Sequence, residues 1–279
     1  MHPNPIQSKY NIDFPKFISN NFKIVDKYSE EVAFVPNKVQ LDFYKNIGIA
    51  NIILKARQLG LTSFVLAIFT VIFLLFENQT IFFVAQDKDN AEKLLKKVKF
   101  YIESFEKKNG VTIPLGYNSK SELSHKTNNS TFYVGTAGSA TLGRGSTITC
   151  LHLSEVAFYT NGEELIAGIK QALVPGGLSF LESTANGFNF FEEVWSKSVD
   201  RELNYKPHFY GSNWQYTTEF LDDKKKELRR LFPQEYPMSP EDAFLTSGEC
   251  YFNTIVIKST MDKNKNRKLI PFQYVSTIS

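Results

Sequence analysis

The segment whose residues are best suited to chemistry is Lys55–Ser63, KARQLGLTS, which lies between an apolar run and a long apolar helix candidate. It is close to the phosphate-binding pattern G-x-x-x-x-G-K-[ST], with Gly60 and Thr62 at the last glycine and at the hydroxyl position. Backbone N–H groups at a helix N-terminus bind phosphate, and a hydroxyl there can bind Mg²⁺. The segment therefore predicts a loop for ATP and Mg²⁺; a basic turn at the end of a strand is the alternative.

The lysine of that pattern is missing from this chain. Leu61 stands in its place, so the cation that such a loop needs on the β- and γ-phosphates must come from Lys55 or Arg57 at its start. We expect five residues of this loop to line the nucleotide site: Lys55, Arg57, Gln58, Leu61 and Ser63.

A second candidate segment is Ile148–Tyr159, ITCLHLSEVAFY, an apolar strand that ends in an acidic residue. Glu155 lies at the carboxyl end of this strand, where α/β sheets place their ligands. Its carboxylate can orient or deprotonate a water for in-line attack on the γ-phosphate. Ser154 stands where an aspartate is expected, and its hydroxyl is a weaker metal ligand. We expect Mg²⁺ near Thr62, Ser154 and Glu155; the alternative is that Glu155 only caps the following turn.

Small polar residues follow another buried strand in Leu181–Gly187, LESTANG. We expect Ser183, Thr184 and Asn186 to sense the γ-phosphate and to couple its loss to movement of the chain. A plain turn between a strand and a helix is the alternative interpretation of this segment.

An arginine between two glycines, Arg144 in ATLGRGS, precedes the acidic strand. An arginine on such a loop suits a finger that neutralises the charge of the transition state, in cis or across a subunit boundary. A solvated arginine in a turn is the alternative.

The pattern of apolar residues predicts the elements that must position these groups. Strands alternate with helices, which favours an α/β fold with a mainly parallel central sheet flanked by helices. The expected strands are Asn51–Leu54, Thr80–Ala85, Leu123–Lys126, Thr131–Val134, Ile148–Leu153, Leu178–Glu182 and His208–Gly211. The expected helices are Gln40–Ile49, Thr62–Phe76, a helix opened by Asp89 and ended by Gly110, Asn161–Leu173, Asn189–Ser198 and Thr218–Leu231. Between two of these elements, Pro175-Gly176-Gly177 is expected to form a turn.

The sequence also suggests a division of the chain. Residues 1–35 are mixed and contain prolines, which indicates an irregular arm with a short helix. Residues 36–205 carry the motifs and the alternating pattern, and are the expected core. Residues 206–255 are expected to form a small C-terminal subdomain, with a helix start at Ser239 and Pro240. Residues 256–279 are expected to form a tail.

The composition excludes several classes of protein. Hydrophobic residues make up 42% and charged residues 22%, as in ordinary soluble domains. The longest apolar run, Phe64–Phe76, is shorter than the roughly 18–20 residues of a membrane span, so we expect no membrane partner. The 2 cysteines have no metal-binding spacing, and a net charge of +3 is compatible with nucleic acid without arguing for it.

Taken in order, the segments resemble the large terminase subunit of tailed bacteriophages, the ATPase that packages DNA into the prohead. That family often carries an ARQ-x-G-x-T loop, which residues 56–62 match. Its acidic strand is followed by a sequence like Glu155–Tyr159, and its coupling motif is similar to Ser183–Gly187. Residues 232–237, FPQEYP, and 239–244, SPEDAF, are also similar to the family. The resemblance covers about residues 35–255.

The resemblance implies a P-loop NTPase-type core, followed by a lid subdomain, and a role for each motif residue. Gln40 would contact adenine, and Glu155 would be the catalytic carboxylate. Arg144 would act on a neighbour's ATP in a ring of subunits. The remaining roles are phosphate and Mg²⁺ binding at Arg57, Gly60 and Thr62, and coupling at Ser183 and Thr184.

The resemblance also implies partners and a setting. These are double-stranded DNA, the portal protein, the small terminase subunit and further copies in a homo-oligomeric ring, in the cytoplasm of the bacterial host. Large terminases continue into a nuclease domain, so we expect residues 256–279 to begin a missing nuclease region and the chain not to cleave DNA. Two alternatives stay open: a helicase-like ATPase, and a catalytically weak nucleotide-binding protein that assembles partners.

Overall fold

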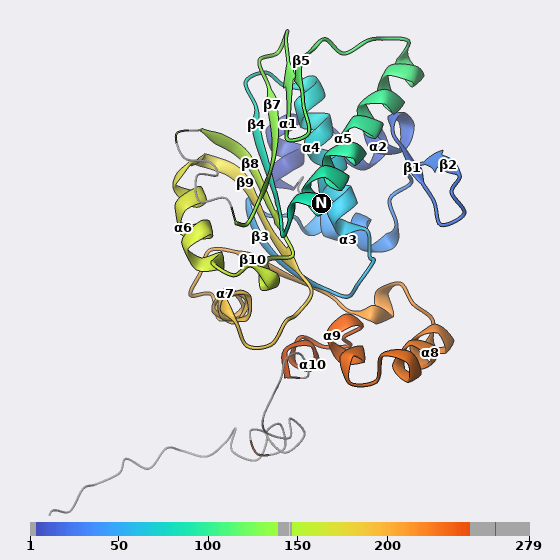
Figure 1. The fold of residues 1–279 in the computed structure, drawn as a ribbon, viewed down its shortest axis with the longest axis vertical. Helices are drawn as coiled ribbons and strands as arrows, with labels where there is room; N and C mark the ends of the chain where they lie inside the picture. The colour runs from blue at the N-terminus through green and yellow to red at the C-terminus, as the bar shows by residue number, and fades with distance from the viewer. Residues whose placement is uncertain (1–3, 139–144, 146, 246–259, 261–279) are drawn as a thin grey trace, which may run out of the picture.

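The computed structural model describes residues 4–138, 145, 147–245 and 260 of the 279-residue chain. Within these residues the centre of the fold is an 8-stranded sheet in the order β10-β3-β9-β8-β4-β7-β6-β5 (Figure 1). Its strands are β3 (Ala50–Lys55), β4 (Thr80–Ala85), β5 (Leu115–Asn118), β6 (Glu122–His125), β7 (Thr131–Thr136), β8 (Ile148–Ser154), β9 (Leu173–Ser183) and β10 (Lys206–Tyr210).

The sheet is parallel from β10 to β7 and antiparallel beyond it, where β6 and β5 continue the edge. Helices cover both faces, with α4 and α5 on one side and α6 and α7 on the other (Figure 1). The prediction of an α/β fold with a mainly parallel sheet flanked by helices is confirmed. The four flanking helices are α4 (Leu61–Leu75), α5 (Lys88–Asn109), α6 (Gly162–Gln171) and α7 (Phe190–Val199). A further helix, α3 (Lys38–Asn46), precedes β3.

Helix α4 is apolar on every side because it has neighbours on every side. All of its residues from Phe64 to Leu74 are buried, between the sheet, α5 and the N-terminal helices. A helix of this kind belongs in a core. Its first turn is thereby fixed at the carboxyl end of β3.

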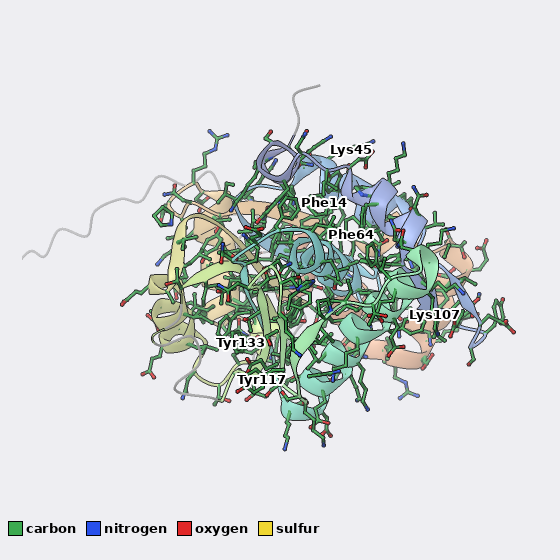
Figure 2. All side chains as sticks on the ribbon, turned by 90° about the horizontal axis from the view of Figure 1, so that it is seen from above. Phe14, Lys45, Phe64, Lys107, Tyr117 and Tyr133 are labelled. Atoms are coloured by element: carbon green, nitrogen blue, oxygen red, sulfur yellow. The ribbon has the colours of Figure 1, made fainter. Side chains whose placement is uncertain are left out.

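The N-terminal residues are better ordered than the sequence suggested. An irregular arm with a short helix was expected, whereas the structure has two helices packed on the core, α1 (Pro5–Tyr10) and α2 (Phe14–Asn21), followed by a hairpin of β1 (Lys23–Val25) and β2 (Glu31–Ala33). Both helices begin with a proline in their first turn, a position that proline favours. Phe14 and Phe64 lie inside the molecule, whereas the Lys107 side chain projects from its surface (Figure 2).

Three local expectations need correction. Helix α5 is capped by Asp87, whose carboxylate accepts the Asn90 N–H at 2.8 Å, and not by Asp89. The predicted turn at Pro175-Gly176-Gly177 is part of β9, where Gly176 has φ +73° and the pairing with β8 shifts register. A glycine irregularity inside a strand explains why the segment looked like a turn. Strand β5 was not predicted; it pairs with β6 at the sheet edge.

The C-terminal elements lie at one end of the sheet (Figure 1). Strand β10 still belongs to the sheet, next to β3. Three helices follow: α8 (Thr218–Leu228), α9 (Phe232–Glu235) and α10 (Pro240–Leu245). The predicted helix 218–231 ends at Leu228 and is followed by a 3-10 turn. Except for Thr260, residues 256–279 lie outside the described residues.

In the described part of the chain, the helices are all too short or too polar to cross a bilayer.

Candidate active site

The predicted phosphate loop joins the end of β3 to the start of α4. Gln58 and Gly60 both have left-handed backbones, with φ of +57° and +77°. A Cβ at Gly60 would lie 2.7 Å from Gln40 Nε2, so both the backbone angle and the available space require glycine. Helix α4 thus begins directly after this turn, with Gly60 as its N-cap and, among the described residues, no side chain capping its first N–H groups.

Gln40 holds this loop in place. Its Nε2 donates to the Gly60 carbonyl at 2.8 Å, and its Oε1 accepts from the Asn37 N–H at 2.9 Å in a capping box. Gln40 therefore fixes the loop to α3. Contact between Gln40 and adenine stays a prediction.

A cavity of about 420 Å³ opens beside the loop, within the size range of small-molecule sites. The sequence-predicted residues that line it are Lys55, Arg57, Gln58, Gly60, Leu61, Thr62, Ser63, Ser154 and Glu155. The loop and the acidic strand, about 100 residues apart in sequence, thus meet at one site. Gln40, Ser183 and Thr184 do not line this cavity.

Helix α5 contributes a wall that the sequence analysis did not assign. Asn90, Lys93 and Lys97 face the cavity, and Lys97 Nζ donates to Ser63 Oγ at 3.0 Å. Their spacing of three and four residues puts them on one face of the helix. That spacing was the available signal, and the two lysines add positive charge to the cavity.

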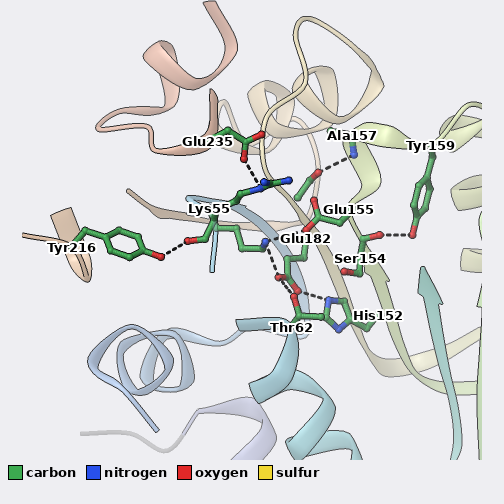
Figure 3. A network of polar contacts seen from close by, with 12 residues as sticks. Lys55, Thr62, His152, Ser154, Glu155, Ala157, Tyr159, Glu182, Tyr216 and Glu235 are labelled. Carbon is green, nitrogen blue, oxygen red and sulfur yellow. Dashed lines mark hydrogen bonds and ion pairs between the residues drawn. The ribbon is translucent and has the colours of Figure 1, made fainter. Parts of the chain in front are cut away.

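Lys55 is the buried cation of the site (Figure 3). Its Nζ lies 3.2 Å from Glu155 Oε1 and 3.4 Å from Glu182 Oε1. Burial alone would lower the pKa of Lys55, but the two carboxylates outweigh it and raise the pKa above its usual value. Lys55 is therefore charged and can replace the lysine that Leu61 displaces.

Glu182 is a site residue that sequence reasoning missed. It is fully buried on β9; Thr62 Oγ1 donates to its Oε1 at 2.6 Å, and His152 Nε2 lies 2.7 Å from its Oε2 (Figure 3). Burial alone would raise the pKa of Glu182, but Lys55, His152 and Thr62 outweigh it and lower the pKa to about 2. The available signal was a glutamate inside an otherwise apolar strand.

Glu155 stands at the turn after β8. It has a left-handed backbone with φ +61° and begins a 3-10 turn. Such a backbone is unusual for a residue other than glycine, and strain of this kind gathers at functional sites. The Glu155 side chain is 35% exposed, so a water can reach it from the cavity. Behind it, the Tyr159 hydroxyl lies 2.9 Å from the Ser154 carbonyl oxygen.

The predicted coupling residues contact the Glu155 turn from behind. Ser183 Oγ accepts the Ala157 N–H at 3.1 Å, and Asn186 Nδ2 donates to the Ala157 carbonyl at 3.2 Å. Ser183 and Thr184 are buried. The segment after β9 is thus tied to the segment that carries the acidic residue, and contact with a γ-phosphate stays a prediction.

Arg57 connects the loop to the C-terminal helices. Its guanidinium forms an ion pair with Glu235, its N–H donates to the Glu235 carbonyl at 2.9 Å, and its carbonyl accepts from the Tyr216 hydroxyl at 2.8 Å. Burial raises the pKa of Glu235, against the attraction of Arg57. Arg144, the predicted finger, lies outside the described residues.

The residues present suit a Mg²⁺ ion that arrives with a nucleotide. Among the described residues, no three His, Cys, Asp or Glu side chains form a group that could hold a metal. The Thr62 hydroxyl at the cavity, backed by a carboxylate, is the kind of oxygen ligand that Mg²⁺ accepts beside phosphates and waters.

Solved structures place this fold among known proteins, although no protein-family model and no curated protein matches the chain. The ATPase domain of the large terminase of Thermus phage P74-26 matches with a TM-score of 0.60 and 18% identity, over 72% of this chain and 92% of that one. The large terminase of bacteriophage HK97 matches with a TM-score of 0.58 and 15% identity, over 91% of this chain and 52% of that one.

A third match is the large terminase of a thermophilic bacteriophage in complex with ADP. Its TM-score is 0.53 and its identity 14%, over 71% of this chain and 52% of that one. The chain thus spans about half the length of two of these three proteins. The chain has the fold of the ATPase domain of phage large terminases.

Proposed function

We propose that this chain is a Mg²⁺-dependent ATPase and the motor domain of a phage DNA-packaging terminase. The observation that carries the proposal is the meeting of a phosphate loop, the cation of Lys55 and the carboxylate of Glu155 at one cavity. Phosphoryl transfer depends mainly on positioning and on charge stabilisation, and these groups supply both.

Each group has a distinct role in the proposed reaction. The unpaired N–H groups at the start of α4 hold the phosphates, and Lys55 neutralises their charge from the start of the loop. Glu155 orients the attacking water and accepts its proton. Mg²⁺, when bound, stabilises the charge of the phosphates, and Thr62 is its ligand from the protein. Arg57 reaches the phosphates once it leaves Glu235.

The motor role rests on the fold and on the ordered motifs. The three solved structures described above come from large terminases, one of them in complex with ADP. By that likeness, the chain drives double-stranded DNA as part of a homo-oligomeric ring, in which Arg144 acts on a neighbour's ATP. Its partners are the portal protein and the small terminase subunit, and its setting is the cytoplasm of the bacterial host.

One observation favours a second candidate, a protein that binds nucleotide and assembles partners without turnover. Lys55 forms an ion pair with Glu155, so the carboxylate that should hold the water is engaged. The serine at position 154 adds no charge beside it. Binding and hydrolysis therefore have to be measured separately.

The test is ATP hydrolysis by the purified chain, followed as phosphate release with and without Mg²⁺. Glu155→Gln removes the base at nearly constant volume, and Glu164→Gln is the matched control because Glu164 is exposed on α6. We expect Mg²⁺-dependent turnover that falls about 100-fold or more in Glu155→Gln, the contribution typical of a general base, and that is unchanged in the control.

Two outcomes would contradict the proposal. Turnover that survives Glu155→Gln would remove Glu155 from the reaction. Nucleotide binding without turnover, even with double-stranded DNA and a portal protein present, would favour the assembly protein.

A further inference from the structure

The strand register sets Ser154 and Glu182 beside each other. Strands β8 and β9 run parallel, with Ser154 opposite Glu182 and His152 opposite Phe180. Residues opposite each other in a parallel pair point to the same face of the sheet. The carboxylate absent from position 154 is therefore present one strand away, on the same face.

Strand β9 is adjacent to β3, the strand that leads into the phosphate loop. It lies between β3, which leads into the loop, and β8, which leads into Glu155. Glu182 is opposite Ile53 on the β3 side, so its longer side chain reaches the first turn of α4, where Thr62 Oγ1 donates to it at 2.6 Å. A glutamate on β9 therefore reaches the Thr62 hydroxyl, which an aspartate on β8 would otherwise contact.

We propose that Glu182 replaces the missing aspartate as the residue that positions Thr62 for Mg²⁺. A threonine hydroxyl has one proton and two lone pairs. When the proton is donated to Glu182, the lone pairs are free to face the cavity and the metal. This inference rests on the proposed nucleotide site, and it makes Glu182 a positioning residue because it acts through Thr62.

The surroundings hold Glu182 in this role. Its Oε1 contacts Thr62 and Lys55, while its Oε2 faces the fully buried His152 on β8. Rotation of the carboxylate away from Thr62 would also break the ion pair with Lys55 and move Oε2 from its place 2.7 Å from His152 Nε2. Partners of this kind, which orient a metal ligand from behind, change metal affinity by about 10- to 100-fold when they are removed.

A purely structural role makes a different prediction. If Glu182 only neutralised Lys55 inside the core, its loss would lower stability and affect nucleotide binding equally with and without Mg²⁺. If it positions Thr62, its loss affects the Mg²⁺-dependent part of binding, and a carboxylate returned at position 154 restores that part.

The experiment is a fluorescence titration of a methylanthraniloyl-labelled ATP analogue against the full chain, with and without Mg²⁺. In Glu182→Gln we expect the apparent Mg²⁺ affinity to fall about 10- to 100-fold, a larger change than the one in metal-free binding that follows from the loss of the charge beside Lys55. Adding Ser154→Asp to this variant should restore the effect of Mg²⁺. Thermal unfolding without nucleotide shows that each variant is folded.

A folded Glu182→Gln variant with wild-type Mg²⁺ dependence overturns the inference, and so does a double variant without rescue. If Glu182→Gln does not fold, Glu182→Asp is the second variant, because it keeps the charge next to Lys55 but is too short to reach Thr62. It should show the same loss of Mg²⁺ affinity and the same rescue by Ser154→Asp. A wild-type chain that binds nucleotide with Mg²⁺ but does not hydrolyse it contradicts the ATPase proposal alone. A wild-type chain that binds no nucleotide overturns both.

Discussion

Lys55 is a cation removed from water and held by two carboxylates. A buried charge is tolerated only when it is paired, and Lys55 pairs with Glu155 at the cavity and with Glu182 inside the sheet. The same side chain therefore contributes to stability and to the electrostatics of the site. Substitutions at these residues will affect both, and the two effects need separate measurements.

We predict that Lys55→Met abolishes ATP hydrolysis and destabilises the fold. The variant leaves Glu182 buried beside an apolar chain, and removing one partner of a buried pair costs about 3–5 kcal/mol. Urea unfolding and phosphate release measure the two effects. Lys96→Met, at an exposed position of α5, is the control. Full activity in Lys55→Met would exclude Lys55 as the cation on the phosphates.

The lowered pKa of Glu182 predicts how stability changes in acid. The unfolded carboxyl has its ordinary pKa of 4.5 and the folded one a pKa of about 2, so folding favours the ionised form. The stabilisation is complete above pH 4.5 and is lost as the pH falls toward 2. Glu182→Gln should therefore lose less unfolding free energy between pH 5 and pH 3 than the wild type, as measured by urea midpoints. Equal losses would mean that the carboxyl is not held in its ionised form.

At the scale of elements, the loop depends on a contact between α3 and the turn before α4. Gly60 accepts a hydrogen bond from Gln40 and has a left-handed backbone. These two features belong to different elements, and together they set where the N-terminus of α4 points. The turn is therefore sensitive to any added side chain.

We predict that Gly60→Ala destabilises the fold by about 1–2 kcal/mol through its backbone angle, and weakens nucleotide binding because the new Cβ displaces Gln40. Gly168→Ala is the matched control. Gly168 lies within α6 with nothing near its added Cβ, so alanine there should stabilise the helix by up to about 1 kcal/mol. Thermal unfolding of the two variants should shift in opposite directions. Shifts of the unfolding temperature in the same direction would contradict the backbone strain assigned to position 60.

The elements show what the sequence could and could not predict. Continuous apolar runs such as Thr80–Ala85 predicted the buried parallel strands, since both faces of such strands are covered. The motifs predicted the loop and the Glu155 turn because these depend on local residue order. Glu182 was missed because its role arises from register with β8, which no local pattern contains. One short helix was expected in residues 1–35, whereas the structure has two, and their prolines lie at the helix starts.

At the scale of the whole molecule, Arg57 joins the loop before α4 to the segment that precedes α8 and to α9. Arg57 is bound at its side chain and backbone by Glu235 and at its carbonyl by Tyr216. The proposed site needs the Arg57 side chain for phosphate. In the proposed function, nucleotide and Glu235 therefore compete for the same guanidinium.

We predict that Glu235→Gln tightens nucleotide binding, because Arg57 no longer has to leave an ion pair. The Arg57 side chain is 61% exposed, and such pairs are worth up to roughly 1 kcal/mol, so the gain should be about fivefold at most. Titration with the labelled ATP analogue measures it, with Glu227→Gln at an exposed site on α8 as control. Weaker binding in Glu235→Gln would mean that Glu235 supports the site rather than competing with it.

The enclosure of α4 has a mechanical consequence. A helix surrounded by close-packed side chains has no free face along which to slide. Because α4 anchors the loop, ligand entry should displace the loop less than the turn at Glu155 and the helix α9 that carries Glu235, the partner of Arg57. Any force that the chain transmits would therefore pass through the Glu155 turn and through the helix that contacts Arg57.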